Sequence, residues 1–204
     1  MKQLINLIVG IAALTLMASA TAAGGNKLAP DVLVKTTADD VLAIIKNDKD
    51  IQSGDTKKIG ALAEAKILPN FDFDQMSRMV LGKYWNQASA DQQQQFVQQF
   101  RTLLVRTYSS ALAKYRNQTI EYKPFRGQPE DTRVTVKTQI IQSGAQPLAI
   151  DYSLLKESDG SWKVYDVVIE GVSLVTNYRS QFANEVKQNG MDALIKRLAD
   201  KNNK

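Results

Sequence analysis

The spacing of apolar residues divides the chain into parts with different periods. From residue 30 to about residue 118, apolar side chains recur at three- and four-residue steps, the period of amphipathic helices. From residue 119 to residue 172 they alternate with polar ones, the period of half-buried strands. Helical spacing returns over 174–188 and 191–200. The pattern predicts an α+β domain with a helical half over 30–118, a sheet over 119–172 and terminal helices over 174–200.

Within the helical half, the spacing predicts helices over 30–48, 55–66, 74–81 and 89–115. The last of these is the most strongly marked. Ser89 and Gln92 have the spacing of a capping box, in which each side chain bonds the other residue's backbone N–H. Phe100, Leu104 and Tyr108 belong to one apolar stripe that continues along this helix. Core packing explains such a stripe best, and the wall of an apolar pocket is the alternative.

The sheet half contains alternating segments over 120–122, 134–140 and 148–154. Ser143-Gly144 and Asp159-Gly160 stand where hairpin turns are needed. The segment that follows the second turn, 162–169, is apolar on both faces, which is typical of a strand covered on both sides. We therefore expect an antiparallel meander of at least four strands, with helices on one face and more helix or a cavity on the other.

The first residues have the pattern of an export signal. Lys2 precedes an apolar run over 4–17, and Ala20-Thr21-Ala22 matches the small-x-small motif of a signal-peptidase site. The run is short for a transmembrane span. The sequence therefore predicts a cleavable signal peptide over 1–22, cleavage near Ala22, a single domain over 23–204 and a periplasmic location.

The amino-acid composition excludes several kinds of catalytic and binding site. The 204 residues include no cysteine and no histidine, which excludes disulfides, thiolate nucleophiles, histidine bases and Cys/His metal sites. A formal net charge of +5 on an exported chain is too mild to indicate nucleic-acid binding. No phosphate-binding glycine motif or nucleophile elbow occurs. Asp72 and Asp74 could approach a cation, but Asp72 is better explained as a helix cap.

Two acids stand in the most apolar strand of the chain, Asp166 and Glu170. A carboxylate buried in an apolar pocket could act as a general base. The interpretation we favour is structural, in which these acids bond backbone groups or a basic residue such as Arg179, because a buried carboxylate is costly unless it is paired.

Two segments resemble the MlaC family, the periplasmic phospholipid-binding components of the maintenance-of-lipid-asymmetry, or toluene-tolerance, systems. The first runs over 76–85 and contains Val80-Leu81-Gly82 followed by an aromatic pair. The second runs over 162–174, and its part from Tyr165 to Leu174 is the most specific. The similarity extends over essentially the whole chain after the signal segment.

The resemblance implies a nuclear-transport-factor-like cone, in which a curved antiparallel sheet and helices enclose an apolar pocket. It implies a carrier that holds the acyl tails of a glycerophospholipid and shuttles between an outer-membrane lipoprotein–porin complex and an inner-membrane ABC transporter complex. It implies no catalytic residue, no metal and no cofactor besides the lipid cargo. The expected lipid-binding residues are Val80, Phe100, Leu104, Tyr108, Val136, Ile150, Tyr152, Val164, Val167, Ile169 and Val172.

Two other functions stay open at this point. One is an isomerase-type enzyme on the same cone fold, with Asp166 or Glu170 as base, which predicts a small closed pocket with an acid at its floor. The other is a non-catalytic periplasmic adaptor with a filled core, which predicts no extractable ligand. For a lipid carrier, Val172→Glu is expected to release the lipid without unfolding the protein, because it places a carboxylate among the tails.

Overall fold

The computed structural model describes residues 27–113, 115 and 117–203. The predicted signal peptide and its cleavage site lie outside these residues. The helices before the sheet are α1 (Pro30–Asn47), α2 (Lys49–Gln52), α3 (Thr56–Leu62), α4 (Phe73–Leu81) and α5 (Ala90–Ala113). The π-helical segment η1 (Ala63–Ile67) and the 3₁₀ segments η2 (Leu68–Asn70) and η3 (Gly82–Gln87) connect them. The helices after the sheet are α6 (Leu174–Asn189) and α7 (Met191–Asn202).

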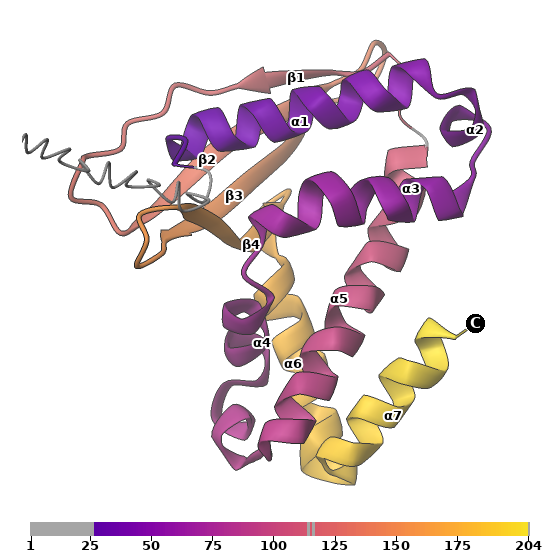
Figure 1. The fold of residues 1–204 in the computed structure, drawn as a ribbon, viewed down its shortest axis with the longest axis vertical. Coiled ribbons are helices and arrows are strands. Elements are labelled where there is room, and N and C mark those ends of the chain that lie inside the picture. The colour runs from indigo at the N-terminus through magenta and orange to yellow at the C-terminus, as the bar shows by residue number, and fades with distance from the viewer. Residues whose placement is uncertain (1–26, 114, 116, 204) are drawn as a thin grey trace, which may run out of the picture.

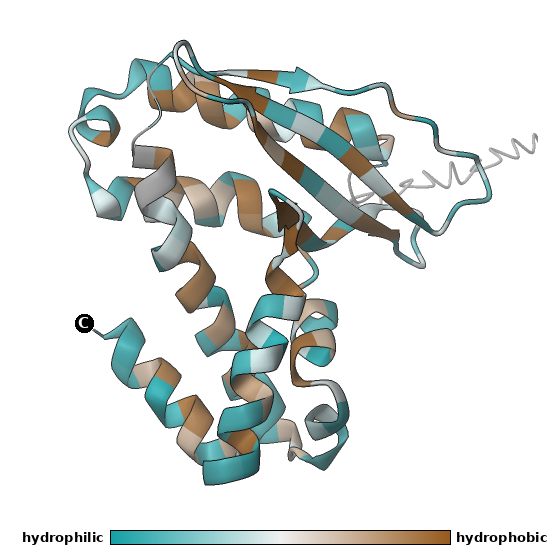
Figure 2. Cartoon of the chain, turned by 180° about the vertical axis from the view of Figure 1, so that it is seen from behind, coloured by the Kyte–Doolittle hydropathy of each residue, from teal (hydrophilic) through white to brown (hydrophobic). Residues whose placement is uncertain are grey.

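The strands form one antiparallel meander in the order β1-β2-β3-β4-β5. They are β1 (Thr119–Tyr122), β2 (Arg133–Ile141), β3 (Leu148–Lys156), β4 (Trp162–Ile169) and β5 (Val172–Ser173). The apolar–polar alternation along β2 and β3 can be followed in Figure 2. The predicted α+β architecture with an antiparallel sheet of at least four strands is confirmed.

The helices are arranged in two groups around the curved sheet (Figure 1). Helices α1 and α3 lie on one side of the sheet, and α4, α5, α6 and α7 form a helical layer that extends away from it. Helix α5 joins the two groups, since it packs on α7 near its start and on α3 farther along. In the helical layer, Phe96, Phe100, Tyr178 and Phe182 pack edge-to-face and stacked, with ring centroids 5.3–5.9 Å apart.

The helix starts form as their side chains predict. Ser89 Oγ accepts a hydrogen bond from Gln92 N at 3.2 Å, and Gln92 Oε1 accepts one from Ser89 N at 3.0 Å, which completes the capping box of α5. Asp72 Oδ1 accepts from Gln75 N at 2.8 Å and caps α4. Asp72 is thus a helix cap, as expected. Gly190, at φ +84°, separates α6 from α7.

Some predicted boundaries are wrong. The helix predicted over 55–66 ends as an α-helix at Leu62 and continues as the π-helical η1.

A β-bulge partly explains why the predicted strand over 162–169 is apolar on both faces. The register between β3 and β4 shifts between Ser153 and Leu154, so Val164 and Val167 both reach the face of the sheet that carries Leu154 and Tyr152. Helices α4 and α6 also contact β4.

Candidate functional site

An apolar cavity of about 320 Å³ lies between α1, the sheet and the end of α5. This volume is within the range of small-molecule binding sites, about 300–1,000 Å³. From α1 it is lined by Leu33, Val34, Thr37, Ala38, Val41 and Leu42. From the sheet it is lined by Ile120, Ile140, Ile150, Tyr152, Val164, Val167 and Ile169. The remaining walls are Ile67, Asn70, Phe71, Tyr108, Leu112 and Tyr115.

A second apolar cavity of about 170 Å³ branches from the same region toward the helical layer. It adds residues of α4, η1, α5 and α6 such as Met76, Ala63, Leu104 and Leu174. The residues that line both cavities are Ile67, Phe71, Tyr108, Leu112, Val167 and Ile169. The two cavities therefore adjoin each other at these six residues. The arrangement therefore offers a branched apolar space.

No residue that is charged at neutral pH lines either cavity among the described residues. Burial raises the pKa of Tyr152, and burial also raises the pKa of Tyr108, so both hydroxyls stay neutral. The Tyr115 hydroxyl donates to the Gln118 carbonyl, and Ser109 Oγ donates to the Val105 carbonyl. These polar side chains of the two cavities are therefore either hydrogen-bonded or uncharged. Such walls suit a hydrocarbon ligand rather than a polar substrate.

Most of the site residues predicted on the strands surround this space. Ile150, Tyr152, Val164, Val167 and Ile169 line the main cavity. Val136 is buried on the same face, opposite Tyr152, but it does not line the cavity. The lipid-binding role of these residues stays a prediction.

The residues predicted on helices divide into two groups. Tyr108 lines both cavities and Leu104 lines the second. Val80 and Phe100 are instead fully buried in the core of the helical layer, and they line neither cavity. The structure does not support their assignment to the pocket wall. Helix α5 has 24 residues and is about 36 Å long, so its single apolar stripe passes from a packed core at Phe100 to a cavity at Tyr108.

Val172 lies at the rim of the site rather than in its wall. Its side chain is 56% exposed and lines neither cavity. It pairs directly across from Ile169, which lines both cavities, so the two side chains share one face of the sheet. The turn between them places Glu170 and Gly171 at φ +48° and +78°, as a tight two-residue hairpin requires. Val172 therefore lies just beyond the lining of both cavities, and its lipid-binding role stays a prediction.

The wall on α1 was not predicted from the sequence. Val34, Ala38 and Val41 follow one another at helical spacing, and this signal predicts a buried face. Nothing in the spacing distinguishes a face that borders a cavity from one that packs on a core. The same holds for Phe71, which precedes α4 and lines both cavities.

The two acids considered as bases have structural partners. Asp166 Oδ1 accepts from Val167 N at 2.8 Å and Val175 N at 3.1 Å, and Oδ2 accepts from Ser173 Oγ at 2.6 Å. It thereby fastens the first turn of α6 to β4. Neither this carboxylate nor that of Glu170 lines either cavity.

Glu170 bonds the backbone of the neighbouring strand. Its carboxylate accepts from Ala149 N, and its own N–H donates to Ala149 O at 3.0 Å. Arg179 is not its partner, since Arg179 Nε donates to Met79 O at 2.7 Å. The structure thus gives both acids the anchoring role that we favoured over catalysis.

The described residues form no candidate membrane span and no candidate metal site. None of their helices combines the length and the apolar character that crossing a bilayer requires. They also contain no group of three or more His, Cys, Asp or Glu side chains placed to hold a metal ion.

Comparisons with known proteins agree on one family. A model of the MlaC protein family matches residues 35–200. The chain is 27% identical over 171 residues to the intermembrane phospholipid transport system binding protein MlaC of Haemophilus influenzae, covering 83% of this chain and 80% of that protein. It is 26% identical over 164 residues to the toluene tolerance protein ttg2D of Pseudomonas putida, covering 80% of this chain and 75% of that protein.

A solved structure shows the same fold. The phospholipid-binding protein from Ralstonia solanacearum, determined in complex with a phospholipid, superposes with a TM-score of 0.79 at 43% identity. The match covers 84% of this chain and 96% of that one.

Proposed function

This chain belongs to the MlaC family, and from that membership and the branched apolar cavity we propose that it binds and carries a glycerophospholipid. We place the acyl tails in the cavity between α1 and the sheet and in the second cavity beside it. Relatives named as phospholipid transport and phospholipid-binding proteins support this proposal. The single observation that carries it is a cavity with apolar walls and no charged lining residue among those described.

The energetics explain why such a cavity suits a lipid carrier. Two acyl tails contain about 30 methylenes, and exposing them to water at roughly 0.8 kcal/mol each would cost on the order of 25 kcal/mol. A soluble carrier can extract a lipid only if its interior replaces almost all of the hydrocarbon contact that the bilayer supplied. Apolar walls that grip tails do not select a headgroup by themselves, since they make no hydrogen bond to it.

The finer parts of the proposal concern where the protein works. We propose that it is exported to the periplasm and receives and delivers phospholipid at two complexes, an outer-membrane lipoprotein–porin complex and an inner-membrane ABC transporter complex. A carrier role is supported by the names of the two relatives, one an intermembrane phospholipid transport protein and the other a toluene tolerance protein. Under this proposal the protein has no catalytic residue, and the lipid is cargo rather than substrate or cofactor.

Lipid extraction tests the proposal. The purified protein is extracted with organic solvent and the extract is analysed by mass spectrometry, alongside Ile150→Glu and Val168→Glu. Ile150 lines the cavity, whereas Val168 pairs with Asp151 on the opposite face of the sheet. We expect phospholipid in near-stoichiometric amount from the wild type and Val168→Glu, and little from Ile150→Glu, because a carboxylate among the tails is costly to bury. A wild-type protein that yields no phospholipid after loading from vesicles would contradict the proposal.

A further inference from the structure

A polar cavity of about 360 Å³ adjoins the apolar one. It lies between α1, the η1–η2 region and the start of β4, and its side chains include Thr36, Asp40, Lys66 and Lys163. Two residues, Thr37 and Asn70, line both this cavity and the apolar cavity. The two spaces therefore share a boundary, with apolar walls on one side and charged side chains on the other.

The boundary itself is a hydrogen-bonded pair. Asn70 Nδ2 donates to Thr37 Oγ1 at 3.0 Å and to Lys66 O at 3.0 Å, which ties α1 to the end of η1. Thr37 and Asn70 are half-buried, and they supply a hydroxyl and an amide at the edge of the apolar cavity. A phospholipid presents groups in the same order, with tails, then ester carbonyls that accept hydrogen bonds, then a charged phosphate.

The charges of the polar cavity favour an anion. Lys66 and Lys163 face a single carboxylate, Asp40, across this space. Lys163 Nζ donates to the Pro69 carbonyl, which holds the ammonium group at the wall of the cavity. Neither lysine forms a salt bridge with any described residue, and the side chain of Lys163 is half-buried. The charge of Lys163 also acts on Glu157 and Asp159, which lie outside this cavity. Two ammonium groups that line one cavity and form no salt bridge are a suitable site for a phosphate.

We infer that Lys66 and Lys163 bind the phosphodiester of the carried lipid, while Thr37 and Asn70 contact its glycerol ester region. This inference rests on the proposed function and adds recognition of the headgroup to it. These contacts orient the lipid. The phosphate then lies at the η1–β4 side of the cavity, and the tails run under α1 toward Tyr115 and Ile120. The apolar walls hold the tails, and the lysines distinguish a phospholipid from a lipid with the same tails and no phosphate.

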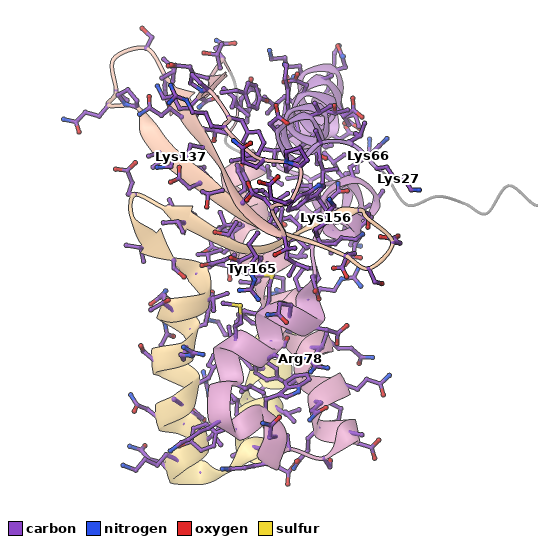
Figure 3. The ribbon with its side chains drawn as sticks, turned by 90° about the vertical axis from the view of Figure 1, so that its left-hand side faces the viewer. Lys27, Lys66, Arg78, Lys137, Lys156 and Tyr165 are labelled. Carbon is purple, nitrogen blue, oxygen red and sulfur yellow. The ribbon has the colours of Figure 1, made fainter. Side chains whose placement is uncertain are left out.

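A competition between two lipids tests the inference. The protein is loaded from detergent micelles that contain equal amounts of dioleoyl phosphatidylethanolamine and dioleoylglycerol, and native mass spectrometry gives the ratio of the two bound forms. The test variant is Lys66→Met with Lys163→Met. The matched control is Lys137→Met with Lys187→Met, which removes the same charge from exposed positions outside both cavities. Figure 3 shows Lys66 beside the N-terminal helices and Lys137 on the sheet side.

We expect the ratio of bound phospholipid to bound dioleoylglycerol to fall about tenfold in the test variant, the effect of two partly exposed charge contacts together. The control should keep the wild-type ratio. Binding of dioleoylglycerol should be unchanged in every variant, which shows that the variants are folded. An unchanged ratio in the test variant, with both lipids still bound, would overturn the inference and leave the carrier function standing. A wild-type protein that binds neither lipid would contradict the carrier function itself.

Discussion

Ala38→Phe tests whether the cavity between α1 and the sheet is the space that holds the tails. Ala38 is half-buried on α1 and lines the main cavity. A phenyl ring at this position projects into a volume of about 320 Å³. In a packed core a change from a small to a large side chain costs about 1–3 kcal/mol of stability, because neighbours must move. In a vacant cavity the ring enters free space, so we expect no loss of stability in the lipid-free protein.

The effect on lipid binding is expected to be large. The ring displaces about five methylenes of tail, which at roughly 0.8 kcal/mol each amounts to about 4 kcal/mol of lost contact. Since about 1.4 kcal/mol corresponds to a tenfold change in affinity, the affinity for phospholipid should fall by nearly three orders of magnitude.

The assay compares Ala38→Phe with Ala43→Phe, which adds the same ring to an exposed position on the same helix. Delipidated proteins are unfolded in urea to measure stability, and phospholipid affinity is then measured by titration from micelles. Ala43→Phe should bind lipid as the wild type does. The reasoning is refuted if Ala38→Phe binds phospholipid normally, or if it destabilises the lipid-free protein by the 1–3 kcal/mol expected of a packed interior.

Three further outcomes are expected. Val172→Glu should lower the amount of bound phospholipid with little change in urea midpoint, because Val172 is exposed at the cavity rim; an unchanged lipid content would place the rim elsewhere. Asp166→Ala should reduce stability by about 2–3 kcal/mol in urea unfolding, because the buried N–H groups of Val167 and Val175 lose their acceptor. A loss below about 0.5 kcal/mol, which is typical of a surface substitution, would contradict this expectation. Burial raises the pKa of Asp39, but hydrogen bonds from Lys35 and Tyr122 outweigh it and lower the pKa. The resulting stabilisation is present above the ordinary pKa of Asp and is lost as the pH falls below about 4, so Tyr122→Phe should cost a few tenths of a kcal/mol at pH 7 and less at pH 3. If Tyr122→Phe reduced stability equally at both pH values, a stabilising hydrogen bond to the ionised Asp39 would be contradicted.

Much of the fold could be predicted from local patterns. The alternation in β2 and β3 predicted their pairing, and the Ser89–Gln92 capping box predicted the start of α5 within a residue. These features depend on neighbours in the sequence, so their physical causes can be read directly from it. The anchoring role of Asp166 also followed from the cost of burying an unpaired carboxylate in an apolar strand.

The candidate site was harder to predict because a cavity is the absence of atoms at a place where several elements meet. The stripe on α5 is continuous in the sequence, yet Phe100 packs on Tyr178 and Phe182, while Tyr108 borders vacant space. No residue type marks the change, since the same apolar side chains serve both environments. The bulge in β4 had the same effect, because it turned Val164 and Val167 to one face against the simple alternation.

The most direct test of the central claim is to locate the tail inside the protein. The protein is loaded with a phosphatidylcholine that carries a diazirine at the end of one acyl tail, irradiated, digested and sequenced by mass spectrometry. We expect adducts on cavity residues of α1, β3 and β4, such as Val41, Ile150 and Ile169. Adducts confined to the packed helical core around Val80 and Phe100, or to the outer surface, would contradict the account.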